Sequence, residues 1–187
     1  MITRTFDLPI LDWIRENLAC PFLDAVMPTI THLGDAGLVW IALALVLLCI
    51  PKWRKCGITM ALALLMGLVV CNLYLKPTIG RMRPFDYQLM YGRVIPLLIE
   101  APTDFSFPSG HTIASFEAAT ALLLHSKKAG IAALGLAALI AFSRLYLYVH
   151  YPTDVIASIV LGTAIAFLAN FLVNKGVALY HNKQILQ

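Results

Sequence analysis

Charged residues are scarce in this chain of 187 residues: 13% of them are Asp, Glu, Lys or Arg, whereas 60% are apolar. A soluble domain of this length would carry about 25% charged residues. The deficit excludes an ordinary soluble domain and predicts a polytopic membrane protein with a single domain. The net charge of +4 is small and the Lys and Arg residues are scattered, so we expect no nucleic-acid partner.

Paired cysteines and metal-binding clusters are also lacking. The four cysteines form no C-x-x-C pair and are interpreted as small buried hydrophobic residues. No spacing typical of metal ligands occurs, so we expect neither a metal nor another cofactor. No cleavable signal peptide is expected either, because Asp7, Asp12 and Glu16 follow Arg4 where an apolar region would be needed.

Long apolar stretches are abundant and predict an all-α bundle of transmembrane helices. A helix needs about 17–25 residues to cross the hydrocarbon core of a membrane. Five stretches are expected to cross, and a sixth crossing stays open. They lie near Gly34–Ile50, Gly57–Leu75, His111–His125, Gly130–Val149 and Val155–Val173.

The residues before these stretches follow a different pattern. Segment Pro9–Thr31 contains several charged side chains and two interior prolines, while Leu11, Ile14 and Leu18 recur at helical spacing. We therefore expect an amphipathic helix in the membrane interface, followed by a half-buried segment. The single domain then divides into an interfacial segment 1–33, a transmembrane bundle 34–173 and a tail 174–187.

Lys and Arg residues indicate how the bundle is oriented. Connectors Pro51–Cys56 and Ser126–Lys128 contain five of them and no acidic residue, so the positive-inside rule places these connectors in the cytoplasm. Counted over all connectors, Lys and Arg are divided evenly between the two sides of the membrane. The cytoplasmic excess returns when Lys76, Arg83 and Arg144, which are assigned below to a site, are left out. On this topology, Lys76–Gly110 and the turn around His150 lie on the extracytoplasmic side. The expected location is a bacterial plasma membrane.

The first motif, residues 76–84, closes the second apolar stretch. Pro77 and Gly80 are expected to end the helix, with the cations Lys76, Arg81 and Arg83 around them. An Arg guanidinium suits phosphate oxygens and Lys acts as a mobile point charge. The alternative is an interfacial cation cluster that contacts lipid headgroups.

The second motif, residues 108–111, opens the third stretch. Ser109 offers a hydroxyl, Gly110 a backbone amide at a helix start where anions bind, and His111 a proton for a leaving oxygen. The alternative is that Ser109 only caps the helix. Glu117 lies six residues after His111, about 240° around a helix, and is expected to point elsewhere.

The third motif, residues 143–154, joins the last two stretches. Ser143 and His150 are seven residues apart, which would place them on one helical face with Arg144 nearby. Pro152 then fits the start of the next helix, with Asp154 in its first turn. A carboxylate at one ring nitrogen of His150 would fix the tautomer and leave the other nitrogen free to attack. The alternative is a pair that ties two helices together.

The three motifs together resemble the type 2 phosphatidic acid phosphatase superfamily, whose pattern is K-x6-R-P, then P-S-G-H, then S-R-x5-H-x3-D. Every fixed position occurs in order between Lys76 and Asp154, about two-fifths of the chain. The N-terminal segment carries no part of the resemblance.

The resemblance implies a role for each motif residue. His150 would be the nucleophile that forms a phosphohistidine, Asp154 would orient it, and His111 would protonate the leaving group. A second set would hold the phosphoryl oxygens: Lys76, Arg83, Ser109, Gly110 and Arg144. Electrostatic stabilisation of this kind is often the largest catalytic contribution.

The function that follows is metal-independent hydrolysis of a lipid phosphate or diphosphate. Candidate substrates are a polyprenyl diphosphate such as undecaprenyl diphosphate, phosphatidylglycerophosphate and phosphatidate. The sequence leaves the lipid and the oligomeric state open. Two alternatives remain: vanadate-dependent haloperoxidases share these motifs, and a non-catalytic protein could bind phospholipid through the same cations.

Overall fold

The chain folds into helices. The computed structural model describes residues 2–185, and side chains up to residue 179; within these limits it contains no strand. The expected all-α class is therefore confirmed. The α-helices are α1 (Leu8–Leu18), α2 (Pro21–His32), α3 (Leu38–Cys49), α4 (Arg54–Leu68), α5 (Lys76–Ile79), α6 (Pro84–Met90), α7 (Gly110–His125), α8 (Lys127–Tyr146) and α9 (Pro152–Ile185).

Shorter helical turns connect some of these elements. Two are 3-10 turns, η2 (Asp35–Gly37) and η3 (Pro51–Trp53), and two are π-helical, η1 (Thr3–Asp7) and η4 (Val69–Leu75). Helix α7 lies inside the bundle and packs against α4, α8 and α9. Its alanines Ala118, Ala119 and Ala121 are fully buried, and such small side chains let helix backbones approach closely.

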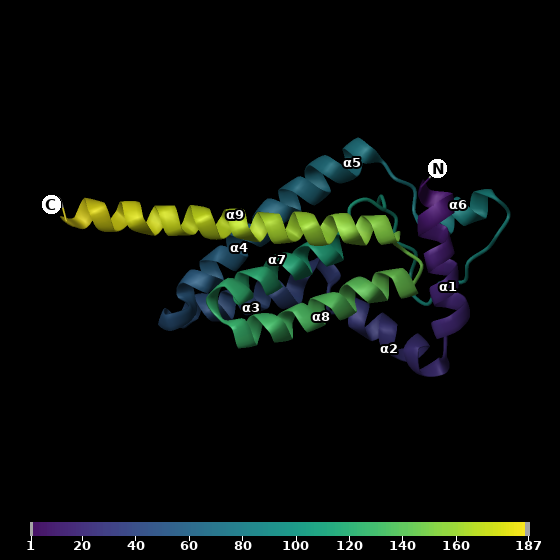
Figure 1. Ribbon diagram of the computed structural model, residues 1–187, viewed down its shortest axis with the longest axis horizontal. Coiled ribbons are helices and arrows are strands. Elements are labelled where there is room, and N and C mark those ends of the chain that lie inside the picture. Colours follow the sequence, from purple (N-terminus) through teal and green to yellow (C-terminus); the bar gives the residue numbers. More distant parts are fainter. Residues whose placement is uncertain (1, 186–187) are drawn as a thin grey trace.

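Figure 1 shows α1 lying across one end of the bundle, beside α6, whereas α9 extends beyond the other helices at the opposite end. Helix α1 buries Leu8, Leu11 and Ile14, whereas its expected position in the membrane interface stays a prediction. These side chains pack against the segment between α8 and α9, including Tyr148 and Val149. The N-terminal helix therefore covers the turn that carries His150.

Fewer helices than expected are long and apolar enough to cross a membrane. Three qualify among the described residues: Pro51–Met90, Lys127–Tyr146 and Pro152–Leu179. A fourth is added if the pair Pro21–His32 and Asp35–Cys49, bent by 43°, forms one broken span. The expected span His111–His125 corresponds to α7, whose 16 residues reach only about 24 Å. The chain is an integral membrane protein, and five spans are not confirmed.

The expected continuous helix from Ser143 to His150 is wrong. Helix α8 ends at Tyr146, and Tyr148 adopts a left-handed conformation with φ of 61° that few side chains tolerate. The Tyr148 hydroxyl donates to Asp12 at 2.8 Å and accepts from Gln88 at 3.0 Å, and these two contacts hold the turn. His150 therefore lies in a tight turn, next to the start of α9.

Candidate active site

A cavity of about 720 Å³ opens beside this turn. Its wall includes residues of α3, α4, α7 and α8 and of the loop before α7. Six of the eight predicted site residues line it: Lys76, Arg83, Gly110, His111, Arg144 and His150. The structure therefore brings the three motifs together around one space. Asp154 lies behind His150, and Ser109 lies outside the lining.

His150 is buried, and its two ring nitrogens face different partners. Nε2 lies 3.3 Å from Arg83 Nη1, which donates to it. Nδ1 lies 3.5 Å from Asp154 Oδ2, which is longer than a good hydrogen bond, and has no hydrogen-bond partner among the described residues. Burial is the largest cause and lowers the pKa of His150; Asp154 opposes this shift, and Arg83 and Arg144 add to it. The ring is therefore neutral, as a nucleophile requires.

Asp154 is fully buried in the first turn of α9, as the position of Pro152 predicted. It accepts from Ser106 Oγ at 2.5 Å and from the Tyr151 amide at 3.0 Å, and it also pairs with Arg81. These donors hold the carboxylate as an anion behind the His150 ring.

Arg83 and Lys76 meet at one carboxylate that the sequence did not single out for this role. Both cations pair with Asp104, in the loop before α7, and Arg83 also donates to the Val149 carbonyl at 2.7 Å. Burial alone would raise the pKa of Asp104, but the two cations outweigh it and lower that pKa to about 2. Lys76 and Arg83, which were predicted to hold phosphate, are thus paired with the carboxylate of Asp104.

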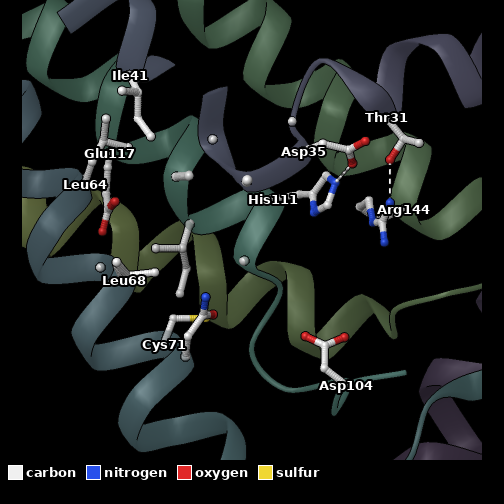
Figure 2. Close-up of a pocket in the computed structure, with 18 of the residues that line it drawn as sticks. Thr31, Asp35, Ile41, Leu64, Leu68, Cys71, Asp104, His111, Glu117 and Arg144 are labelled. Atoms are coloured by element: carbon white, nitrogen blue, oxygen red, sulfur yellow. Dashed lines mark hydrogen bonds and ion pairs between the residues drawn. The ribbon is translucent and has the colours of Figure 1, made fainter. Parts of the chain in front are cut away.

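His111 forms the second histidine–carboxylate pair of the cavity. Its Nε2 lies 2.9 Å from Oδ1 of Asp35 in η2, and Figure 2 shows the two side chains facing each other. Gly34 makes this approach possible, because a Cβ there would lie 2.7 Å from His111 Cδ2. Sequence reasoning missed Asp35; its only local signal is an acid at the start of an apolar stretch, between Gly34 and Gly37.

Arg144 is buried and directed toward the cavity. Its Nη1 donates to Thr31 Oγ1 at 2.6 Å (Figure 2), while its Nε has no partner among the described side chains. A buried cation with a free donor suits an incoming anion. The structure thus provides donors from three directions, on Lys76, Arg83 and Arg144.

Ser109 shows the capping geometry that was its alternative. It is the N-cap of α7, and its Oγ accepts from Thr112 Oγ1 at 2.9 Å and from the Thr112 amide at 3.4 Å. Its own amide donates to Ser158 at 2.9 Å. Contact between Ser109 and phosphate therefore stays a prediction.

The far end of the cavity is apolar. Figure 2 shows Leu64 and Leu68 of α4 and Ile41 of α3 at this end, away from His111. Glu117 also lines it, contrary to the expectation that this side chain points elsewhere, because the cavity extends along α7. Gly67 leaves room for the carboxyl group, whose oxygens have no hydrogen-bond partner in the part of the chain described. The cavity thus joins a cationic end to an apolar end.

Known proteins are similar to this chain in both sequence and fold. Residues 54–177 match the sequence model described as the PAP2 superfamily. An undecaprenyl-diphosphatase of Sulfolobus acidocaldarius is 39% identical over 134 residues, which cover 70% of this chain and 62% of that protein, less than two thirds of its length. Undecaprenyl-diphosphatase BcrC of Bacillus subtilis is 31% identical over 150 residues, covering 78% of this chain and 72% of that one.

A solved structure from the same superfamily has a similar fold. The crystal structure of a transmembrane PAP2-type phosphatidylglycerolphosphate phosphatase from Bacillus subtilis superposes with a TM-score of 0.73 at 29% identity, covering 92% of this chain and 87% of that one. The matched family region spans more than half of the chain and contains all three motifs. The chain therefore belongs to the PAP2 superfamily.

Proposed function

We propose that this chain is an integral membrane phosphatase that hydrolyses a lipid phosphate or diphosphate through a phosphohistidine on His150. The observation that carries the proposal is the placement of His150. A neutral imidazole has its Nε2 beside Arg83 at the cationic end of a cavity, with the carboxylate of Asp154 behind the ring. The two relatives and the solved structure described above are all named as phosphatases or diphosphatases, which supports the same reaction class.

The proposed reaction has two steps. His150 Nε2 attacks phosphorus, and the bond from phosphorus to the leaving oxygen breaks while His111 gives that oxygen a proton. A water molecule then attacks the phosphohistidine and loses its proton to His111, which releases phosphate and restores His150. Asp35 would hold the His111 ring in place during both proton transfers. Lys76, Arg83 and Arg144 would stabilise the charge on the transferring group.

Binding of phosphate requires Asp104 to move away from its cations. The carboxyl side chain of Asp104 is 52% exposed, so it can turn into solvent when substrate oxygens replace it at Lys76 and Arg83. The amide of Gly110 at the start of α7 is a further proposed donor. A role for Ser109 would need its buried hydroxyl, which lies outside the cavity lining, to reach a phosphate oxygen.

The preferred substrate that we propose is a polyprenyl diphosphate. Its long hydrocarbon chain would fit the apolar end between α3 and α4, and three cations suit the larger charge of a diphosphate. Relatives named undecaprenyl-diphosphatase support this choice. Phosphatidylglycerophosphate is the second substrate, supported by the name of the superposed structure.

The finer topology belongs to the same proposal. We propose five spans, with α7 as the short one, enclosed by α4, α8 and α9. Helix α1 would lie in the interface, and the site would face the extracytoplasmic side of a plasma membrane. The division into segments 1–33, 34–173 and 174–187 of one domain is kept; residues 186–187 of the tail lie outside the described residues.

Phosphate release from purified protein across a lipid panel, in the presence of chelator, tests this function. The panel contains undecaprenyl diphosphate, phosphatidylglycerophosphate and phosphatidate. We expect the diphosphate to be hydrolysed fastest, and His150→Ala to lower kcat by about 1,000-fold or more, as loss of a nucleophile does. His125→Ala is the matched control, because His125 closes α7 at its other end, where its ring bonds the Ala121 carbonyl of the same helix. Full activity of His150→Ala would overturn the mechanism.

A further inference from the structure

We propose that the N-terminal segment is part of the catalytic machinery: Asp7 and Arg81 are positioning residues that hold Asp154 in place behind His150. This inference rests on the proposed function, since it assigns a role within the same site. Neither residue is a fixed position of the three motifs, and Asp7 lies outside the region matched by the family.

Arg81 bridges two buried carboxylates. Its Nη1 donates to Asp154 and, at 2.8 Å, to Thr153 Oγ1, while its Nη2 donates to Asp7 at 2.6 Å. Its guanidinium also lies 3.9 Å from the centre of the Tyr151 ring, a cation–π contact. Arg81 is absent from the cavity lining, unlike Arg83 two residues later, so its position suits it to hold protein groups rather than phosphate.

Asp7 acts as a cap for a helix that begins 145 residues later in the chain (152 − 7). The N-cap position of α9 is Tyr151, whose side chain cannot accept a hydrogen bond from the first turn. Asp7 supplies the missing acceptor: Oδ1 accepts from the Thr153 amide and Oδ2 from the Thr153 hydroxyl, both at 2.9 Å. Asp7 is fully buried, so these contacts are shielded from solvent.

Asp154 completes the cap from inside α9. Its carboxylate accepts from the Tyr151 amide at 3.0 Å, which is the return half of a capping box. The partial positive charge of the helix N-terminus favours both carboxylates there, and Arg81 offsets the repulsion between them. The carboxylate that faces His150 is thus fixed by a network that begins in η1.

This network implies a specific failure when it is broken. Without Asp7, Arg81 is free to form a two-point pair with Asp154 and draw that carboxylate away from the His150 ring. Without Arg81, two carboxylates repel each other at the start of α9. Either change displaces the orienting group while leaving the cavity cations intact. A displacement of about 1 Å in an orienting group costs roughly 100-fold in rate.

The test compares Asp7→Asn, Arg81→Gln and the double variant, using undecaprenyl diphosphate as the probe. We expect each single variant to lower kcat by about 10- to 100-fold while KM changes less than twofold, because the phosphate ligands remain. The double variant should be no slower than Arg81→Gln alone, because both act through Asp154. Rates are normalised to folded protein, and the melting temperature is recorded for every variant.

Arg15→Gln is the matched control. Arg15 ties α1 to the loop after α6 through the Pro96 carbonyl, at 3.4 Å, away from the residues that hold Asp154. A loss of kcat in Asp7→Asn no greater than in Arg15→Gln would overturn the inference, and so would rate losses that multiply in the double variant. If the wild type releases no phosphate from any lipid, the proposed function fails. The inference then fails too if the losses in melting temperature of the two single variants simply add.

Discussion

At the residue scale, the site consists of two histidine–carboxylate pairs around one group of cations. The sequence predicted one pair, because His150 and Asp154 are separated by a single helix start. It could not predict the other, because Asp35 reaches His111 across 76 residues and no local pattern records such a contact. The partners of Asp104 could not be predicted for the same reason: only the folded loop shows that it binds Lys76 and Arg83.

Asp104→Asn should improve substrate binding. The carboxylate competes with substrate oxygens for two cations, so its removal is expected to lower KM about two- to fivefold, in line with roughly 0.2–1 kcal/mol for an exposed ion pair. The measurement is KM for undecaprenyl diphosphate at pH 7, with Asp86→Asn as the control in the neighbouring helix α6. An unchanged KM would show that Asp104 does not compete with the substrate, and a higher KM would show that it helps to bind the substrate.

The same variant should change how stability depends on pH. The pKa of Asp104 falls from 3.8 to about 2 in the folded chain, so its ion pairs stabilise the fold above about pH 4 and are lost as the pH falls toward 2. The melting temperature of Asp104→Asn should therefore lie below that of the wild type at pH 6, and the gap should close near pH 2. A gap that stays constant over this range would contradict the assignment.

At the scale of elements, helix starts were predictable and turns were not. Gly110 and Pro152 open α7 and α9 where the sequence places them. The end of α8 was predicted too late, because the left-handed Tyr148 is held by Asp12 and Gln88, which belong to other elements. The cap of α9 by Asp7 is equally invisible to local pattern, since donor and acceptor are far apart in the chain.

Gly34→Val tests whether the turn between α2 and α3 positions His111. The added Cβ would lie 2.7 Å from His111 and 2.9 Å from Ile140, so the histidine must shift. We expect the free energy of unfolding to fall by about 1–3 kcal/mol. We also expect kcat to fall by more than the fraction of unfolded protein accounts for.

Gly135→Ala is the control for this change. A Cβ at Gly135, in α8, meets nothing within 4 Å, so the variant should keep its activity and gain up to about 1 kcal/mol from helix propensity. Normal kcat in Gly34→Val would show that the turn does not position the general acid.

At the scale of the whole molecule, composition correctly predicted an all-α integral membrane protein, and the motifs correctly predicted the superfamily. The number of spans was harder to predict from the sequence. An apolar helix has the same pattern whether protein or lipid covers it. Helix α7 is short and buried among other helices, so its pattern does not show whether it crosses the membrane. The cavity that joins cations to an apolar wall depends on the packing of α3, α4 and α7, which no single segment encodes.

Ala61→Trp tests whether the apolar end holds the lipid chain. Ala61 lines the cavity on α4, and a large ring there would fill the space proposed for hydrocarbon. We expect KM for undecaprenyl diphosphate to rise about 10-fold, because several buried CH₂ contacts at about 0.8 kcal/mol each are lost. The KM for geranyl diphosphate, whose hydrocarbon chain is short, should stay within twofold of the wild-type value. Equal changes for both lipids would place the hydrocarbon chain elsewhere.

The central claim is that His150 carries phosphate during turnover, and the most direct measurement is to trap that phosphate. The enzyme is mixed with terminally labelled undecaprenyl diphosphate, quenched in alkali within one turnover, digested and sequenced by mass spectrometry. The account predicts an alkali-stable, acid-labile phosphate on the peptide that contains His150, absent in His150→Ala and retained for longer in His111→Ala. Turnover with phosphate on another residue, or with no covalent phosphate at any time point, would contradict it.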